Sequence, residues 1–242
     1  MLHDLAGRRV YIGVISARRA SNVELCPVAA TWHVPAGEID VYRVAGATVA
    51  DGGELNAALA RNTVLDAATE LGADAIILDD DLLHVKYAQG GKAIPLEPLA
   101  GLARLVEITL ASGASLGTSA YGMNAYFLGD GPDTRSYGNP GVVAYVPRGR
   151  ASGLRQDVSM RYAEDFDFAL QHHVFGHGFV VCNRLMFKFR HNDVGGLSHE
   201  ASTSDGIQRS NEYMVRKWGS LVRVNARTGN LSMPKPLRGP QK

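Results

Sequence analysis

Three consecutive carboxylates, Asp79, Asp80 and Asp81, follow a short apolar run at residues 75–78. Side chains alternate along an extended chain, so Asp79 and Asp81 are expected to point one way and Asp80 the other. Neighbouring carboxylates repel each other unless a cation lies between them, and Mg²⁺ accepts one or two carboxylates together with oxygens of a substrate phosphate. The triplet therefore predicts either a divalent-metal site for a phosphorylated ligand or a polar turn that ends the strand.

A second group of acids, Glu164, Asp165 and Asp167, stands at the start of a predicted helix over residues 164–175. Acidic residues in a first helical turn are stabilised by the helix dipole, which is the structural explanation for them. The functional explanation is a general base that removes a proton from a substrate hydroxyl.

The two groups together favour a group-transfer site. The first group would hold a metal on a diphosphate leaving group, and the second would deprotonate an acceptor hydroxyl. Arg18 and Arg19 follow the first predicted strand and are candidates for contacting a nucleotide. Arg61 and Asn62, on a predicted helix, are either further donor contacts or part of a solvated face.

The elements that must position these residues follow from hydrophobic periodicity. An Asp51-Gly52-Gly53-Glu54 capping box predicts a helix that ends near Gly72. Alternating strands and helices of this kind predict an α/β fold built on a wound sheet. The predicted strands are residues 10–16, 41–45, 75–78, 125–128, 142–146 and 179–181, and the other predicted helices are 98–112, 164–175 and 204–218.

Composition narrows the classes of protein. The 242 residues suit one domain, no apolar run approaches the roughly 20 residues of a membrane span, and two cysteines are too few for a disulfide framework. We therefore expect a cytoplasmic protein without a membrane partner. Residues 1–121 carry a net charge of −5 and residues 122–242 carry +6, which is compatible with a polyanionic partner.

The order of these motifs resembles that of a GT-A glycosyltransferase, with a nucleotide loop, a helix bearing Arg61-Asn62 and then an Asp-x-Asp motif. More narrowly, the chain is similar to the glycosyltransferases associated with TET/base-J oxygenases. That family is common in bacteriophages and is thought to attach sugars to hydroxymethylated pyrimidines in DNA. The similarity spans about residues 8–220 and is carried by residues 164–171, Gly176-His177-Gly178, Gly195-Gly196 and residues 210–219.

The resemblance implies a single-domain, GT-A-like (Rossmann-like) mixed sheet flanked by helices over residues 1–224, followed by a basic tail over 225–242. It implies Mn²⁺ or Mg²⁺, a nucleotide-sugar donor such as a UDP-sugar, and DNA carrying a modified base as acceptor. Asp79 and Asp81 would hold the metal with His191, for which His199 is a competitor, and Asp80 would contact the sugar or ribose. Asp165 would be the base, supported by Glu164. The donor set is Ser16, Arg18, Arg19, Arg61, Asn62, Asp79 and Asp80.

Several alternatives stay open at this point. The acceptor can be a polysaccharide, lipid or protein, or the chain can be a non-catalytic DNA- or partner-binding module with a degenerate transferase fold. A direct, inverting displacement is the expected route, whereas the sugar, the nucleotide and the oligomeric state are not specified. His172, His173 and His177 are expected at the helix surface or an interface, because a zinc site would need further ligands.

Overall fold

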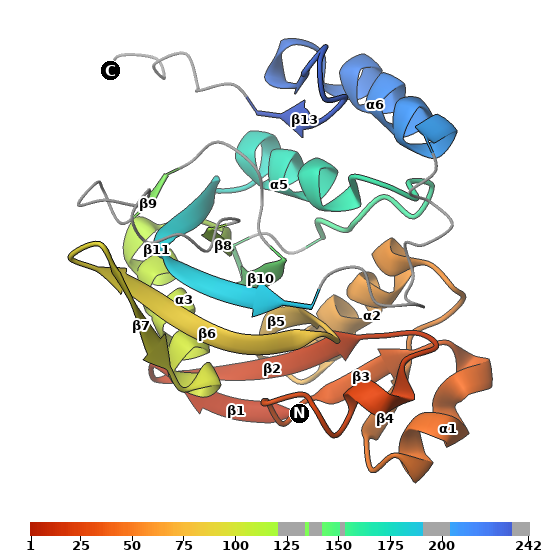
Figure 1. Ribbon diagram of the computed structural model, residues 1–242, viewed down its shortest axis with the longest axis vertical. Helices are drawn as coiled ribbons and strands as arrows, with labels where there is room; N and C mark the ends of the chain where they lie inside the picture. Colours follow the sequence, from red (N-terminus) through yellow and green to blue (C-terminus); the bar gives the residue numbers. More distant parts are fainter. Residues whose placement is uncertain (121–133, 136–141, 151–152, 191–203, 234–242) are drawn as a thin grey trace.

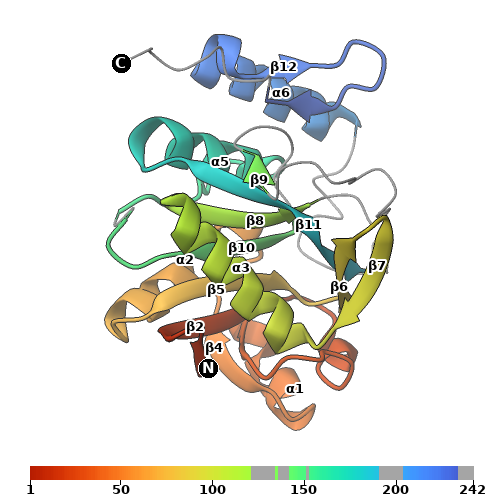
Figure 2. The ribbon, with the colours of Figure 1, turned by 90° about the vertical axis from the view of Figure 1, so that its left-hand side faces the viewer.

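One mixed sheet runs through the molecule and separates helices into two layers (Figures 1 and 2). The computed structural model describes residues 1–120, 134–135, 142–150, 153–190 and 204–233. The strand order is β4-β3-β2-β5-β10-β8-β11-β6-β7, with β1 beside β2 and β9 beside β11. The strands are β1 (Leu2–Leu5), β2 (Arg8–Ile15), β3 (Thr31–Val34), β4 (Thr48–Asp51), β5 (Asp74–Asp79), β6 (Leu82–Gln89), β7 (Lys92–Leu96), β8 (Leu116–Ala120), β9 (Thr134–Arg135), β10 (Val143–Val146) and β11 (Phe179–Phe189).

The sheet is parallel at one end and mixed at the other. Strands β4, β3, β2 and β5 are mutually parallel, as expected where helical crossovers connect them. Strand β10 lies antiparallel between β5 and β8, with Tyr145 opposite both Ile76 and Gly117. Strands β8 and β11 are parallel, and the β6–β7 hairpin extends the sheet beyond β11. The predicted α/β class and the Rossmann-like arrangement are confirmed.

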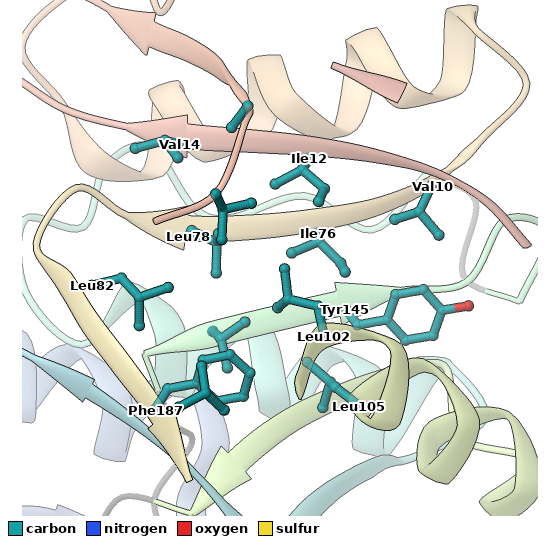
Figure 3. Packing of buried hydrophobic residues seen from close by; sticks show 14 of the residues in the cluster. Val10, Ile12, Val14, Ile76, Leu78, Leu82, Leu102, Leu105, Tyr145 and Phe187 are labelled. Atoms are coloured by element: carbon teal, nitrogen blue, oxygen red, sulfur yellow. The ribbon is translucent and has the colours of Figure 1, made fainter. Parts of the chain in front are cut away.

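The helices are α1 (Ile39–Val44), α2 (Ala57–Glu70), α3 (Pro98–Ser112), α5 (Glu164–Phe175) and α6 (Ser204–Trp218), with short 3-10 turns at Ala20–Asn22, Ala36–Glu38 and Gly219–Leu221. Side-chain alternation in the central strands assigns each residue to one layer. Ile12 and Ile76 pack in the cluster that contains Leu102 of α3 (Figure 3), whereas Tyr11 and Ile77 pack in the cluster beneath α2 and α5.

Helix α2 approaches β2 very closely at Gly13. A Cβ placed on Gly13 would stand 2.6 Å from the methyl groups of Val64, so a larger residue would push α2 away from the sheet. This close approach fixes the height of α2 above the carboxyl end of β5. Asp79 continues the alternation of Ala75 and Ile77, so it lies on the α2 face, and Asp80 turns to the opposite side.

Three helices have the bounds that the sequence predicts, namely α3, α5 and α6. Helix α3 shows why: Pro98 occupies its first turn, and Gly113 ends it with a φ of 76°, a left-handed conformation that glycine adopts without strain. The predicted strand at 142–146 is also present as β10. The predicted strand at 125–128 lies outside the described residues.

Other predicted elements are wrong. Residues 41–45 belong largely to α1 rather than to a strand, because Tyr42 alone turns inward while its neighbours stay partly or fully exposed. The second parallel strand along the chain is β3 instead. Asp51 does not cap α2. Its carboxylate accepts a hydrogen bond from Gly53 N, and Asn56 is the N-cap, accepting from Leu59 N at 3.2 Å. Strand β11 is much longer than the predicted 179–181.

Helix α6 and a small hairpin, β12 (Arg223–Val224) and β13 (Leu231–Ser232), lie beyond α5 (Figure 1). The predicted domain boundary at residue 224 falls inside this hairpin, and residues 234–242 lie outside the described residues. Within the described ranges, no helix has both the length and the apolar character needed to cross a bilayer.

Candidate functional site

A pocket of about 330 Å³ lies on the α2–α5 face of the sheet, at the carboxyl end of β5. Strands β5, β10 and β8 form its floor, α2 and the start of α5 form two walls, and β13 contributes Leu231 to the rim. The two acidic groups identified from sequence meet here, because Asp79 and the Glu164-Asp165 pair both line it. Ligand crevices at the carboxyl ends of strands are usual in open α/β sheets.

Arg61 joins the two acidic groups. Its Nη2 lies 3.1 Å from Asp79 Oδ1 and its Nη1 lies 2.5 Å from Glu164 Oε1. Burial disfavours the charge of the guanidinium, but the carboxylates of Asp79 and Glu164 outweigh burial and raise the pKa of Arg61. The side chain is only 15% exposed, so Arg61 does not belong to a solvated helix face. It is a fixed cation between the donor end and the base end of the predicted site.

Asp165 lines the pocket beside Glu164. Its Oδ1 accepts a hydrogen bond from Phe166 N at 2.8 Å. Burial and the charge of Glu164 raise the pKa of Asp165 to about 7, whereas the ordinary value is 3.8. A carboxyl group with such a pKa can accept a proton near neutral pH, as a catalytic base must. Glu164 differs from Asp165 in being paired directly with Arg61.

The backbone is strained where α5 begins. Ala163, which precedes Glu164 and lines the pocket, has a φ of 62°, a left-handed conformation unfavourable for a residue with a Cβ. Such outliers persist only where the surrounding structure imposes them, and they occur often at functional sites. Ala163 is also buried, so the packing around it determines the direction in which Glu164 and Asp165 enter the pocket.

Asp80 and Ser16 are directed into the protein rather than into this pocket. The Asp80 carboxylate accepts hydrogen bonds from the Ser16 hydroxyl and from Arg19 Nη1, the latter at 3.1 Å. Ser16 Oγ also lies 2.6 Å from the Tyr42 hydroxyl. Burial raises the pKa of Asp80 to about 6 even though Ser16 and Arg19 favour its charged form. This network ties the loop after β2 to the end of β5, so Ser16, Arg19 and Asp80 support the predicted donor site from beneath.

The other predicted donor residues are also placed. The backbone N–H of Arg18 donates to Glu38 Oε2 at 2.6 Å, and the Arg18 side chain is exposed outside the pocket. Asn62 is buried, and both ends of its amide are used: Nδ2 donates to Gln156 O at 2.9 Å, and Oδ1 accepts from Gln156 N at 2.8 Å. Asn62 therefore holds the opposite pocket wall, an internal contact rather than a contact with a ligand.

The three acids of the triplet differ in exposure. Asp79 and Asp81 are both partly exposed and Asp80 is buried. Strand β5 ends at Asp79, Asp80 and Asp81 lie in the turn that follows, and Asp81 is not among the residues that line the pocket. The backbone N–H of Arg190 donates to the Asp81 carbonyl at 3.0 Å, so the described part of β11 ends beside the triplet. His191 and His199 lie outside the described residues. Among the residues that are described, no group of three or more His, Cys, Asp or Glu side chains forms a metal cluster.

The predicted surface position of His172 is wrong. The side chain is completely buried in α5, with Nδ1 2.9 Å from Ser115 Oγ and its ring edge-on to Phe168. Desolvation lowers the pKa of His172 to about 4, so the ring is neutral at physiological pH. His173 is partly exposed and His177 is exposed.

Gln156 and Arg161 line the pocket and were not predicted as site residues from sequence. They belong to the segment over residues 148–162, which the sequence shows only to be polar and irregular. Asn62 and Asn56, which bonds the Val158 carbonyl at 2.9 Å, hold this segment against α2. Pairings across such a distance in the chain leave no local pattern in the sequence.

Comparison of the chain with protein-family models finds no match, and comparison with curated proteins finds none either.

Proposed function

We propose that this protein is a metal-dependent glycosyltransferase that moves a sugar from a nucleotide-sugar donor to a hydroxyl group of an acceptor. The observation that carries the proposal is the convergence of Asp79 and Asp165 on one pocket, with Arg61 bonded between Asp79 and Glu164. In this proposal Asp79 would lie beside the diphosphate leaving group, and Asp165, whose pKa is raised to about 7, would be the base. A polar turn after β5 and a charged start of α5 would each explain one acidic group, but neither explains why both groups line the same pocket.

The chemistry is a direct displacement at the anomeric carbon. Asp165 takes the proton of the acceptor hydroxyl while the hydroxyl oxygen forms a bond to that carbon. The bond from the anomeric carbon to the diphosphate oxygen breaks, and the nucleoside diphosphate leaves with the electron pair. Attack opposite to the leaving group inverts the configuration. Arg61 pairs with Glu164 next to the base.

Mn²⁺ or Mg²⁺ fits the residues present, since these ions accept one or two carboxylates plus phosphate oxygens and water. Asp79 and Asp81 would hold the ion, and His191 is the proposed further ligand, because it directly follows Arg190, which is bonded to Asp81. When bound, the ion neutralises the charge that develops on the departing diphosphate. Asp80 keeps the triplet in place through Ser16 and Arg19.

A hydroxymethylated pyrimidine in DNA is the proposed acceptor. The support is the charge of the C-terminal elements: α6 and the β12–β13 hairpin present four exposed arginines to solvent, namely Arg209, Arg216, Arg223 and Arg227. Exposed arginines suit phosphate contacts and predict affinity that falls steeply with salt. Transfer to a polysaccharide, lipid or protein acceptor is the alternative for the same site.

The test is incubation with Mn²⁺, a panel of UDP- and GDP-sugars, and DNA containing 5-hydroxymethylcytosine or 5-hydroxymethyluracil, followed by mass analysis of the released nucleosides. We expect a nucleoside heavier by one sugar. Asp165→Asn should keep donor binding and lose transfer by at least a hundredfold, whereas Asp81→Ala should lose metal-dependent donor binding. Asp40→Asn, a change on the exposed α1 surface, is the matched control and should behave as wild type.

Each alternative has its own result. Donor turnover without a DNA adduct supports another acceptor. Absence of donor binding with either metal supports a non-catalytic binding module and refutes the enzyme. A fully active Asp165→Asn variant refutes the assignment of the base.

A further inference from the structure

Gln156 lines the pocket and carries an unpaired hydrogen-bond acceptor. The residue is 5% exposed and lines the pocket, yet its side-chain Oε1 has no hydrogen-bond partner among the described residues. Its backbone N–H and carbonyl are both bonded to the Asn62 side chain, so the position of Gln156 is fixed by α2. Buried polar atoms in proteins are nearly always paired, and leaving one unpaired is costly. An unpaired amide oxygen in a pocket wall therefore indicates a ligand that donates a hydrogen bond.

Arg161 supplies a cation at the edge of the same pocket. Its Nη1 donates to the Leu55 carbonyl at 2.9 Å, and it has no carboxylate partner within the described ranges. Arg61 differs, because its charge is already matched by Asp79 and Glu164. The exposed guanidinium of Arg161 is thus the pocket group suited to an anion, and a guanidinium binds a phosphate through paired hydrogen bonds.

Aromatic rings complete the lining. Tyr162, Phe166 and Phe168 all contribute to the pocket wall, and the volume of about 330 Å³ has room for one flat ring with its substituents. Stacking of a ring on an aromatic side chain is sequence-tolerant and favourable. The pocket thus combines aromatic side chains for stacking with a flat ring, the Gln156 amide for a hydrogen bond to the edge of that ring, and the Arg161 guanidinium at the rim.

We propose that Gln156 and Arg161 form a nucleotide-binding subsite for the acceptor, in which Gln156 accepts a hydrogen bond from an N–H group on the base edge and Arg161 binds the attached phosphate. The inference rests on the proposed function, in which Asp165 deprotonates a hydroxyl of the molecule in this pocket. It implies that a base in duplex DNA leaves the stack to reach the site, because Gln156 and Phe168 in the pocket wall are buried. Glutamine is a common reader of base edges.

The phosphate contact is tested by comparing 5-hydroxymethyl-2′-deoxycytidine with its 5′-monophosphate, without any donor, by ligand-observed NMR titration. Wild type should bind the monophosphate at least tenfold more tightly than the nucleoside. Arg161→Ala should reduce this ratio to near one without weakening the nucleoside. Arg155→Ala is the matched control, since Arg155 lies in the same segment but is paired with Asp66 at 2.7 Å. Its ratio should equal that of wild type.

The base-edge contact is tested with Gln156→Met, which keeps the length of the side chain and removes the amide. Affinity for both compounds should fall about tenfold. The melting temperature of the free variant should rise by a few degrees, because an unpaired buried oxygen is removed. A purely structural glutamine would give the opposite shift in melting temperature. Gln89→Met, at the exposed end of β6, should change neither quantity.

Four results would overturn the subsite. The first is that wild type binds neither compound saturably. The second and third are that Arg161→Ala keeps the wild-type ratio of monophosphate to nucleoside affinity, and that Gln156→Met binds both compounds as tightly as wild type. The fourth is that both variants weaken UDP binding equally, which would assign the pocket to the donor. The titrations with the nucleoside and its monophosphate omit donor and metal, so they report on the subsite even if sugar transfer is not observed. Loss of transfer in Asp165→Asn with intact nucleotide binding separates the catalytic proposal from this one.

Discussion

Acidification should destabilise the fold through His172, and the size of the effect follows from its surroundings. The ring is completely buried between α5 and the sheet, and Nε2 has no partner among the described residues that would stabilise a proton there. Desolvation lowers the pKa of His172 from 6.5 to about 4 in the folded state. The unfolded chain therefore binds more protons between these two values. Stability is at its full value above pH 6.5 and is lost as the pH falls toward 4.

The magnitude is large relative to the stability of a domain. Each pKa unit corresponds to about 1.4 kcal/mol, so complete loss amounts to roughly 3 kcal/mol, of which about 2.5 kcal/mol is lost by pH 4.5. A typical domain is stable by only about 5–15 kcal/mol. His33, whose pKa is also lowered to about 4 by burial, adds a similar loss in every variant with His33 intact. It therefore cancels when variants of His172 are compared.

The assay is urea unfolding of wild type and His172→Gln at several pH values between 7.5 and 4.5. The glutamine retains a hydrogen-bonding group for Ser115 Oγ and does not titrate in this range. We expect His172→Gln to lose about 2.5 kcal/mol less than wild type across the range. His177→Gln, in the exposed turn after α5, should lose as much as wild type. If wild type and His172→Gln lose the same free energy of unfolding, the assignment of acid sensitivity to this ring is wrong.

Three further outcomes are expected. The rate of transfer should fall about tenfold for each pH unit below 7, because the pKa of Asp165 is raised to about 7 and only its deprotonated form can act as a base. A pH–rate profile that stays flat on the acid side would show that another group is the base. Asp167→Ala should lower the free energy of unfolding by about 3 kcal/mol. The buried Asp167 carboxylate accepts a hydrogen bond from Trp218 Nε1 at 2.8 Å and pairs with Lys217 at 2.8 Å, and the variant loses both contacts. A urea unfolding curve that matches wild type would contradict this expectation. Ala163→Gly should stabilise the protein by up to about 1 kcal/mol in urea unfolding, because glycine adopts the left-handed φ of 62° without a Cβ penalty. A destabilised variant would show that the position is not strained.

The parts of the fold that sequence predicts are those with local signals. Helix α3 has a proline in its first turn and a glycine after its last, and α5 begins with acids that suit a helix dipole. Residues 41–45 have the β-branched composition of a strand but form α1, since one inward residue, Tyr42, is enough to anchor a helical turn. Tertiary packing there overrides local propensity.

The candidate site was predictable only in part, for the same reason. The separation of the partly exposed Asp79 from the buried Asp80, at the end of β5, could be derived from the run of three acids. The pairing of Arg61 with both acidic groups depends on how closely α2 packs on the sheet, and no spacing in the sequence encodes it. Gln156 lies in a polar segment whose sequence does not distinguish it from its neighbours. Its place in the pocket wall depends on its hydrogen bond with Asn62.

Strand β5, which carries Asp79, acquires its two neighbours at very different stages of protein synthesis. Its parallel partner β2 precedes it, whereas its antiparallel partner β10 follows β6, β7, α3 and β8 in the chain. A nascent chain that ends before Val143 therefore exposes one edge of the apolar segment Ala75 to Leu78, with its hydrogen-bonding groups unpaired. Such an edge is a template for pairing with another chain. Premature termination between β8 and β10 should accordingly yield fragments that associate with one another, and the arrival of β10 both ends that hazard and closes the floor of the pocket.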